Sequence, residues 1–223
     1  MIDGNDLTML AGPRFGPTSG KDPRQLIILL HGRGANGDDL IGLAPHFAAA
    51  LPDAAFIAPN APNDCDIGFG FQWFSSEPDS DPATRLGQIR ETAELVNAFI
   101  DDELAKHHLS DSQMALVGFS QGTMMSLFVA PRRENPCAGI IGYSGRLDSP
   151  EALEREIKCR PPVVLVHGDA DNLLPANLMY EAAAALTAIG FDVSSHIRPG
   201  LGHGIDEEGL RLGVEFLSRV LGD

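Results

Sequence analysis

The chain has 223 residues, 43% of them hydrophobic and 21% charged, which is the composition of a globular protein and excludes disorder as its main state. Its 31 acidic residues outnumber the 16 basic ones and give a net charge of −15, so the surface should repel nucleic acids and anionic lipid headgroups. We therefore expect no nucleic-acid partner. A single α/β domain of this length is ordinary, and we expect one domain over residues 1–223.

Short apolar runs alternate with amphipathic stretches along the chain. The runs predict strands at 25–30, 54–58, 114–118, 139–143, 163–166 and 193–197, and the stretches between them predict helices at 39–50, 84–107, 122–130, 176–189 and 207–221. In the second helix Ile89, Ala93, Val96 and Ile100 share one face. Apolar strands that alternate with helices predict an α/β fold, with a mostly parallel central sheet and helices on both faces.

The cysteines and the N-terminal segment bear on the compartment. Cys65, Cys137 and Cys159 are odd in number and widely spaced, which fits neither a disulfide framework nor a zinc site. Residues 1–13 lack the pattern of a signal peptide, and no apolar run approaches the ~20 residues of a membrane helix. We expect a cytoplasmic protein without membrane insertion.

Residues 59–82 interrupt this alternation with many Pro, Gly, Asn and Asp residues, yet they contain Phe69, Phe71, Trp73 and Phe74. A long loop with its own apolar cluster is usually functional in a compact domain. The aromatic side chains are therefore candidate substrate-binding residues in the wall of a cleft. Packing as a small satellite core is an equally good interpretation.

The segment Gly118-Phe119-Ser120-Gln121-Gly122 matches the pattern G-x-S-x-G between a predicted strand and a predicted helix. A serine on so tight a turn presents its hydroxyl above the sheet, and the following helix directs its N-terminal amides to the place where an oxyanion would form. Ser120 is therefore a candidate nucleophile.

A serine hydroxyl needs a base to take its proton and a carboxylate to orient that base. In this architecture the partners follow in the order Ser, Asp, His. Asp169 and Asp171 lie in the loop after the strand at 163–166, and charge alone does not choose between them. His203 lies between glycines before the last predicted helix, where local packing gives little reason for it, and is the candidate base.

A second glycine-rich segment begins at His31, directly after the strand at 25–30. This is the position from which the architecture supplies another oxyanion amide, and a backbone N–H there would not require the side chain of Arg33. The same segment offers a competing interpretation, because Gly32, Gly34 and Gly37 fit the fingerprint of a nicotinamide-dependent oxidoreductase. That fingerprint also needs an acidic residue after the second strand, where this chain has Asn60.

No His-x-x-x-His or His-Glu-x-x-His spacing occurs, so we expect no metal and no cofactor.

Taken together, these segments resemble the phospholipase/carboxylesterase group of α/β-hydrolases, which includes the acyl-protein thioesterases. The resemblance implies an α/β-hydrolase fold without a large lid, Ser120 as nucleophile, Asp171 as the acid and His203 as the base, with the backbone amides of Arg33 and Gln121 as the oxyanion hole. It is carried by segments that span nearly the whole chain: Leu30 to Gly34, Gln72 to Phe74, Gly118 to Gly122, Gly168 to Asp171, and Gly202 with His203. Three positions depart from the family pattern: Arg33, Thr123 and Asn172.

The sequence thus predicts a serine carboxylesterase that acts on a small-molecule ester through an acyl-serine intermediate. The segment between the strands at 139–143 and 163–166, where larger relatives insert a lid, is short, which favours an open cleft and short to medium acyl chains. Thioesters and lysophospholipids are further substrates under this interpretation, and a homodimer is expected by resemblance alone. A hydrolase-fold protein that binds ligands without catalysis is the remaining alternative.

Overall fold

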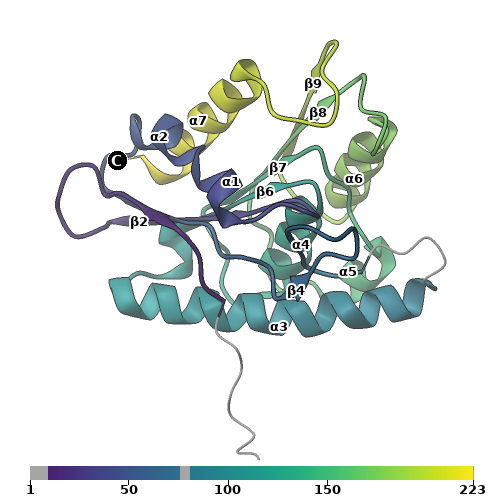
Figure 1. Ribbon diagram of the computed structural model, residues 1–223, viewed down its shortest axis with the longest axis horizontal. Coiled ribbons are helices and arrows are strands. Elements are labelled where there is room, and N and C mark those ends of the chain that lie inside the picture. The colour runs from purple at the N-terminus through teal and green to yellow at the C-terminus, as the bar shows by residue number, and fades with distance from the viewer. Residues whose placement is uncertain (1–9, 76–80, 223) are drawn as a thin grey trace, which may run out of the picture.

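A computed structural model describes residues 10–75 and 81–222 and has a seven-stranded sheet as its middle layer (Figure 1). Of these strands β1 (Arg14–Phe15) runs antiparallel to its neighbour, and the other pairs are parallel. A separate hairpin joins β4 (Asn63–Asp64) to β5 (Phe71–Gln72). In spatial order the strands of the large sheet are β1 (Arg14–Phe15), β3 (Ala54–Ile57), β2 (Gln25–Leu30), β6 (Met114–Phe119), β7 (Gly139–Tyr143), β8 (Val163–Gly168) and β9 (Val193–Arg198).

Helices cover both faces of the sheet (Figure 1). One face carries α1 (Gly37–Ile41), α2 (Ala44–Ala48) and α7 (Glu207–Leu221). The other carries α3 (Pro82–His107), α4 (Gln121–Val129), α5 (Pro150–Glu156) and α6 (Asn177–Ala188), and short 3₁₀ turns lie at Asp111–Gln113 and Ala130–Arg132. The predicted α/β architecture is confirmed. No helix of the described residues is long and apolar enough to cross a membrane.

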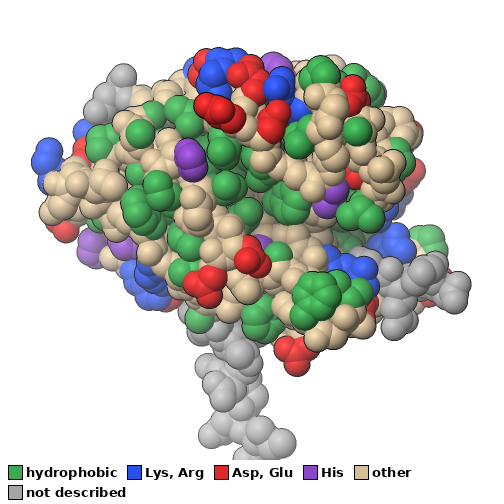
Figure 2. All heavy atoms as spheres, turned by 45° about the horizontal axis from the view of Figure 1, so that its top comes forward, with side chains coloured by type: hydrophobic (Ala, Val, Ile, Leu, Met, Phe, Trp, Pro, Cys, Tyr) green, Lys and Arg blue, Asp and Glu red, His purple; other side chains and the backbone are tan. Residues whose placement is uncertain are grey.

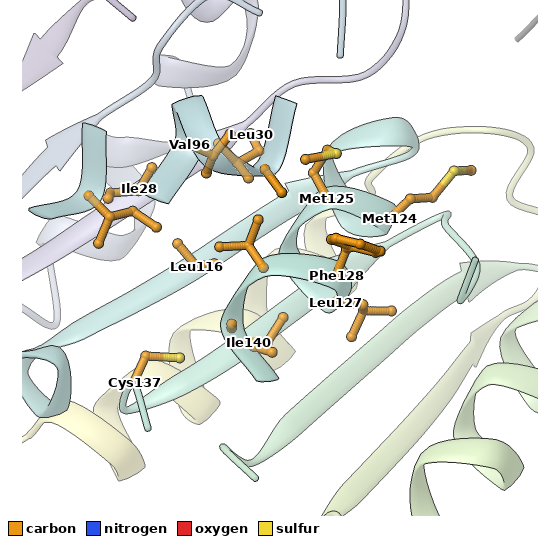
Figure 3. Close-up of a cluster of buried hydrophobic side chains, with 14 of the residues drawn as sticks. Ile28, Leu30, Val96, Leu116, Met124, Met125, Leu127, Phe128, Cys137 and Ile140 are labelled. Carbon is orange, nitrogen blue, oxygen red and sulfur yellow. The ribbon is translucent and has the colours of Figure 1, made fainter. Parts of the chain in front are cut away.

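The strands are apolar along their whole length because both of their faces are covered. In β2, Ile28 and Leu30 pack into the core beneath α3 and α4, whereas Ile27 and Leu29 pack into the core beneath α2 and α7. Figure 3 shows the first of these cores, with side chains of the sheet facing those of α4. Each fully buried side chain of this size contributes ~1.5–3 kcal/mol, so the two cores hold the strand ends in fixed positions.

The prediction of one helix over 39–50 is wrong, because the chain forms the two short helices α1 and α2 there. Pro45 lies in the first turn of α2. A proline inside a helix clashes with the carbonyl group four residues earlier, which here belongs to Ile41, the last residue of α1. The sequence interpretation also missed β1, the hairpin and α5. Between β7 and β8 the described chain adds α5 and short connections, without a large lid.

Candidate active site

The turn between β6 and α4 holds Ser120 in an uncommon backbone conformation, with φ 54° and ψ −115°. Such a conformation is strained for a residue other than glycine and persists only where its surroundings impose it. Gly122 shows how close those surroundings are, since a Cβ at this position would lie 1.8 Å from the carbonyl oxygen of Leu30 in β2. The second glycine of G-x-S-x-G is therefore required by the packing of α4 against β2.

Three loops at the carboxyl ends of parallel strands bring together the predicted Ser, His and Asp. The Oγ atom of Ser120, after β6, lies 2.9 Å from Nε2 of His203, after β9. Nδ1 of the same imidazole lies 2.7 Å from Oδ2 of Asp171, after β8. The aromatic ring of Phe119 lies against the imidazole, with 5.1 Å between ring centroids. The three groups form one continuous chain of hydrogen bonds.

The carboxylate of Asp171 is fully buried and held from two sides. Its Oδ1 atom accepts the backbone N–H groups of Leu173 and Leu174, both at 2.9 Å, and its Oδ2 atom faces His203. Burial alone would raise the pKa of this carboxyl group, but these donors, that of Leu174 foremost, hold the pKa below its ordinary value. The group is therefore ionised near neutral pH and fixed in orientation.

The choice between the two aspartates of this loop follows from their partners. Oδ1 of Asp169 accepts the backbone N–H of Gly200 at 2.6 Å, so this side chain joins two turns. The side chain of Asp171 faces His203 and also lies 3.2 Å from Nε2 of His167. That nitrogen lies 2.7 Å from the carbonyl oxygen of Leu174, which supports the loop from below.

The loop after β2 directs the backbone amide of Arg33. The backbone N–H of Ala61 donates to Nε2 of His31 at 3.0 Å, so the ring proton resides on Nδ1, which donates to the carbonyl oxygen of Gly32 at 2.7 Å. Burial lowers the pKa of His31 and keeps the ring neutral. The carbonyl of Gly32 and the N–H of Arg33 belong to one planar trans peptide and point in opposite directions. His31 therefore fixes the direction of the Arg33 amide.

The side chain of the residue after Ser120 anchors the loop of residues 59–75, which we call the aromatic loop. Sequence reasoning missed this role. Oε1 of Gln121 accepts the backbone N–H of Trp73 at 2.8 Å, and Nε2 donates to the carbonyl oxygen of Phe74 at 2.7 Å. The indole N–H of Trp73 donates to the carbonyl oxygen of His31 at 2.8 Å. Gln121 and Trp73 thus connect the loop to both predicted sources of oxyanion amides.

A pocket of about 520 Å³ opens beside Ser120. Its lining combines apolar side chains with arginines: Arg33, Ile67, Arg85, Phe119, Ser120, Gln121, Met124, Arg146, Leu173, Leu174 and His203. The aromatic loop contributes Ile67 to this lining, and α4 contributes Met124, which is also part of the core beneath that helix. Ile67, Leu173 and Leu174 lie in loops, outside the helices and strands, and such positions carry no periodic signal in a sequence.

The prediction that the four aromatic side chains bind substrate is not supported by their positions. Trp73 and Phe74 are 0% and 2% exposed and belong to the core, where the indole N–H has found a buried partner. Phe71 packs against the same core, and Phe69 is 66% exposed at the surface outside the pocket lining. Trp73 and Phe74 therefore pack in the main core beneath α3 and α4, and not in a small satellite core of the loop.

Thr123 occupies a tight position beneath the serine turn. Its hydroxyl lies 2.9 Å from the carbonyl oxygens of both Gly118 and Tyr143. A Cβ at Gly142 would lie 2.5 Å from Cγ2 of Thr123, and a Cβ at Gly145 would lie 2.4 Å from its Cβ. The departure from the family pattern at position 123 is thus accommodated by two neighbouring glycines.

Comparison with known proteins identifies the family of the chain. The sequence profile described as phospholipase/carboxylesterase matches residues 18–221. The chain belongs to the phospholipase/carboxylesterase family. It is 27% identical to esterase YpfH of Escherichia coli over 88% of this chain and 83% of that protein. It is 26% identical to acyl-protein thioesterase 1 homolog 1 of Dictyostelium discoideum, over 87% of this chain and 90% of that one.

A solved structure, that of esterase PE8, superposes on this family member with a TM-score of 0.91 and 39% identity, over 96% of this chain and 100% of that one. The protein is a carboxylic ester hydrolase with an α/β-hydrolase fold. This membership argues against a nicotinamide-dependent oxidoreductase and against a protein that only binds ligands. Gly37 of the dinucleotide-like fingerprint has a packing role instead, since a Cβ there would lie 2.0 Å from the carbonyl oxygen of Ala58.

Among the residues that the structure describes, no cluster of three or more His, Cys, Asp or Glu side chains could hold a metal ion.

Proposed function

We propose that this protein is a serine carboxylesterase that hydrolyses short- to medium-chain acyl esters through an acyl-serine intermediate. The observation that carries the proposal is the chain of hydrogen bonds from Asp171 through His203 to Ser120 beside the pocket. A serine at a strained turn, an imidazole at 2.9 Å from its hydroxyl and a buried carboxylate behind the imidazole are the parts that acyl transfer requires.

In the first half of the reaction His203 takes the proton of Ser120 as its Oγ attacks the ester carbonyl. The developing oxyanion accepts hydrogen bonds from the backbone amides of Arg33 and Gln121. His203 then gives its proton to the departing alcohol, and the acyl group stays on the serine. Water repeats these steps with the help of the same imidazole and releases the acid.

Asp171 contributes by orientation and charge. The short bond to Nδ1 keeps the imidazole proton on that side, so that Nε2 is available as a base toward Ser120. The ionised carboxylate also stabilises the imidazolium that forms during each half of the reaction. The low pKa of Asp171 keeps this charge in place across the neutral range.

The acyl chain is bound by the apolar part of the lining. This part consists of Ile67, Phe119, Met124, Leu173 and Leu174, in place of the aromatic side chains that the sequence indicated. A volume of about 520 Å³ lies within the range of small-molecule sites. Burial supplies ~0.8 kcal/mol per CH₂, so kcat/KM should rise about fourfold with each added methylene until the pocket is full. The same steps would cleave a thioester or a lysophospholipid ester.

We also propose that the chain acts as one domain in a reducing compartment such as the cytoplasm. The large sheet extends from β1 to β9, and the two core clusters of the described residues pack against the two faces of this one sheet. Cys65, Cys137 and Cys159 are free and buried, which suits a compartment where thiols stay reduced.

The test is Ser120→Ala, assayed with p-nitrophenyl butyrate and by covalent labelling with a fluorophosphonate. We expect no labelling, an unchanged far-UV circular dichroism spectrum and a loss of kcat on the order of 10⁶, the size found when the nucleophile of a related acyl-transfer enzyme is removed. Ser218→Ala is the matched control, because this hydroxyl donates to the helical carbonyl of Val214 outside the pocket. Retention of more than a few per cent of the wild-type turnover by Ser120→Ala would contradict the proposal.

A further inference from the structure

Three arginines line the pocket beside Ser120 although the protein is acidic overall. The chain carries 31 acidic residues against 16 basic ones, and acidic and basic side chains are mixed on the face shown in Figure 2. Among the described residues that line the pocket, Arg33, Arg85 and Arg146 are present and no aspartate or glutamate is. The charged side chains of the described lining are thus all arginines, in contrast to the acidic balance of the whole chain.

Two of these guanidinium groups are each held by an aspartate that binds the edge formed by Nε and Nη2. Nε and Nη2 of Arg33 both donate to Oδ1 of Asp66. Arg146 uses the same two atoms on Oδ1 of Asp148, at 3.1 and 2.9 Å. Both aspartates stand outside the pocket lining, so each guanidinium is anchored from behind.

The Nη1 atom of each of these two guanidinium groups remains available to bind a ligand. In the described part of the chain, Nη1 of Arg33 and Nη1 of Arg146 have no hydrogen-bond partner. Guanidinium groups whose orientation is already fixed lose little freedom when they bind, and their planar N–H pairs match a carboxylate or phosphate. The arrangement is preorganised for an anion.

We propose that this esterase selects esters that carry a negatively charged group, and that Arg33 and Arg146 are its specificity-determining residues. The inference rests on the proposed function. A monoester of a dicarboxylic acid is one such substrate: with one water it yields the dicarboxylate and the alcohol, by the acyl-serine steps described above. In this scheme Ile67 and Leu173 contact the carbon chain while the arginines bind the charged end.

A purely structural role for the arginines predicts a different result. The pair of Arg33 and Asp66 joins the loop after β2 to the aromatic loop, and Arg146 with Asp148 stiffens the loop after β7. If stiffening were their whole function, substitution would lower kcat/KM for charged and neutral esters by the same factor. The readout is therefore the ratio of kcat/KM for a charged ester to that for its neutral counterpart.

Two substrate pairs locate the anion. p-Nitrophenyl hemiglutarate and p-nitrophenyl methyl glutarate differ in a charge on the acyl side. Carboxymethyl butyrate and its methyl ester differ in a charge on the alcohol side. We expect the charged member of one pair to be preferred by roughly tenfold or more, the size of one to two hydrogen bonds to a charged group. The preferred pair identifies the side of the ester that carries the anion.

Arginine substitutions test whether the preference for the charged ester arises in this pocket. Arg146→Gln should lower that ratio by roughly tenfold. Arg211→Gln removes the same charge from the exposed surface of α7, outside this pocket, and should leave the ratio at the wild-type value. Equal loss for both members of a pair in Arg146→Gln, or a wild-type ratio of one or less in both pairs, would overturn the inference.

The Ser120→Ala protein separates this inference from the proposed function. Its dissociation constants for hemiglutarate and methyl glutarate esters are measured by calorimetry, without turnover. Tighter binding of the charged ester that is lost in Ser120→Ala/Arg146→Gln supports the inference even if the wild-type protein hydrolyses neither. Serine-dependent hydrolysis without charge preference leaves the proposed function standing and refutes the inference.

Discussion

Replacing Asp171 by asparagine changes one atom and tests how the site controls the proton of His203. The oxygen of the new amide should stay with the backbone donors of Leu173 and Leu174, which hold Oδ1 at 2.9 Å. The NH₂ group then faces Nδ1 of His203, 2.7 Å away, where Oδ2 was. Because NH₂ is a donor, Nδ1 must become an acceptor, and the ring proton moves to Nε2, facing Ser120.

In that tautomer His203 cannot accept the proton of Ser120. The equivalent change in a serine protease costs ~10⁴ in kcat, which corresponds to about 5.4 kcal/mol of activation free energy. We expect a loss of this order in Asp171→Asn. The folded state should change little, because the two backbone donors keep their acceptor.

The matched control is Asp169→Asn in the same loop. Its Oδ1 accepts the N–H of Gly200, and an amide oxygen can replace it there, so we expect kcat within a few-fold of wild type. Both variants are assayed for kcat with p-nitrophenyl butyrate and for melting temperature by circular dichroism. A larger loss of kcat in Asp169→Asn than in Asp171→Asn would refute the reasoning from the hydrogen bonds.

Three further substitutions test the packing around the site. Trp73→Ala should cost about 3 to 5 kcal/mol of stability. Because the ring is buried outside the pocket, kcat/KM for acetate and octanoate esters should fall by the same factor. A loss of kcat/KM that grows with acyl-chain length would show that the ring contacts substrate. Glu103→Gln should destabilise the protein by about 1 to 3 kcal/mol at pH 7, because the buried carboxylate binds both Nη atoms of Arg14. Burial would raise the pKa of Glu103, but its basic partners hold this pKa below its ordinary value. The stabilisation is therefore present above pH ~4.3 and is lost as the pH falls through the folded-state pKa. A difference in unfolding free energy between wild type and Glu103→Gln that is the same at pH 7 and pH 2, measured by urea unfolding, would contradict this prediction. Gly122→Ala should destabilise by about 3 kcal/mol or more, because the new Cβ meets the carbonyl oxygen of Leu30, and a melting temperature equal to wild type would show that this contact relaxes.

The candidate triad could be predicted because its determinants are local and ordered along the chain. Ser120 lies in a short pattern between a strand and a helix, and His203 lies between glycines after the last strand. In a parallel sheet the carboxyl ends of adjacent strands meet at one edge, so residues that follow different strands come together there. The choice of Asp171 over Asp169 needed the family pattern, since both lie in one loop and only three-dimensional contacts distinguish them.

The aromatic loop shows why other features could not be predicted. Its composition indicates an apolar cluster, but the direction of burial depends on Gln121 and on the carbonyl of His31, which are distant in sequence from Trp73. The apolar pocket lining from Ile67 and Leu173 has no repeat or motif. The helix break at Pro45 could have been predicted from the sequence, because proline disfavours a continuous helix. The prediction of one helix relied too heavily on the spacing of the apolar residues.

The fit of Thr123 between Gly142 and Gly145 has a consequence for how this chain can diverge. A methyl group added at either glycine would collide with the threonine side chain, so each such change would be rejected in the present background. If glycine first replaced Thr123, the closest of these collisions would be removed, and a Cβ at position 142 would still lie 2.9 Å from Cδ2 of Leu165 and one at position 145 would lie 3.0 Å from the carbonyl oxygen of Ser120. The order of substitutions then decides which sequences are reachable, and the three positions should covary in descendants of this protein instead of drifting independently.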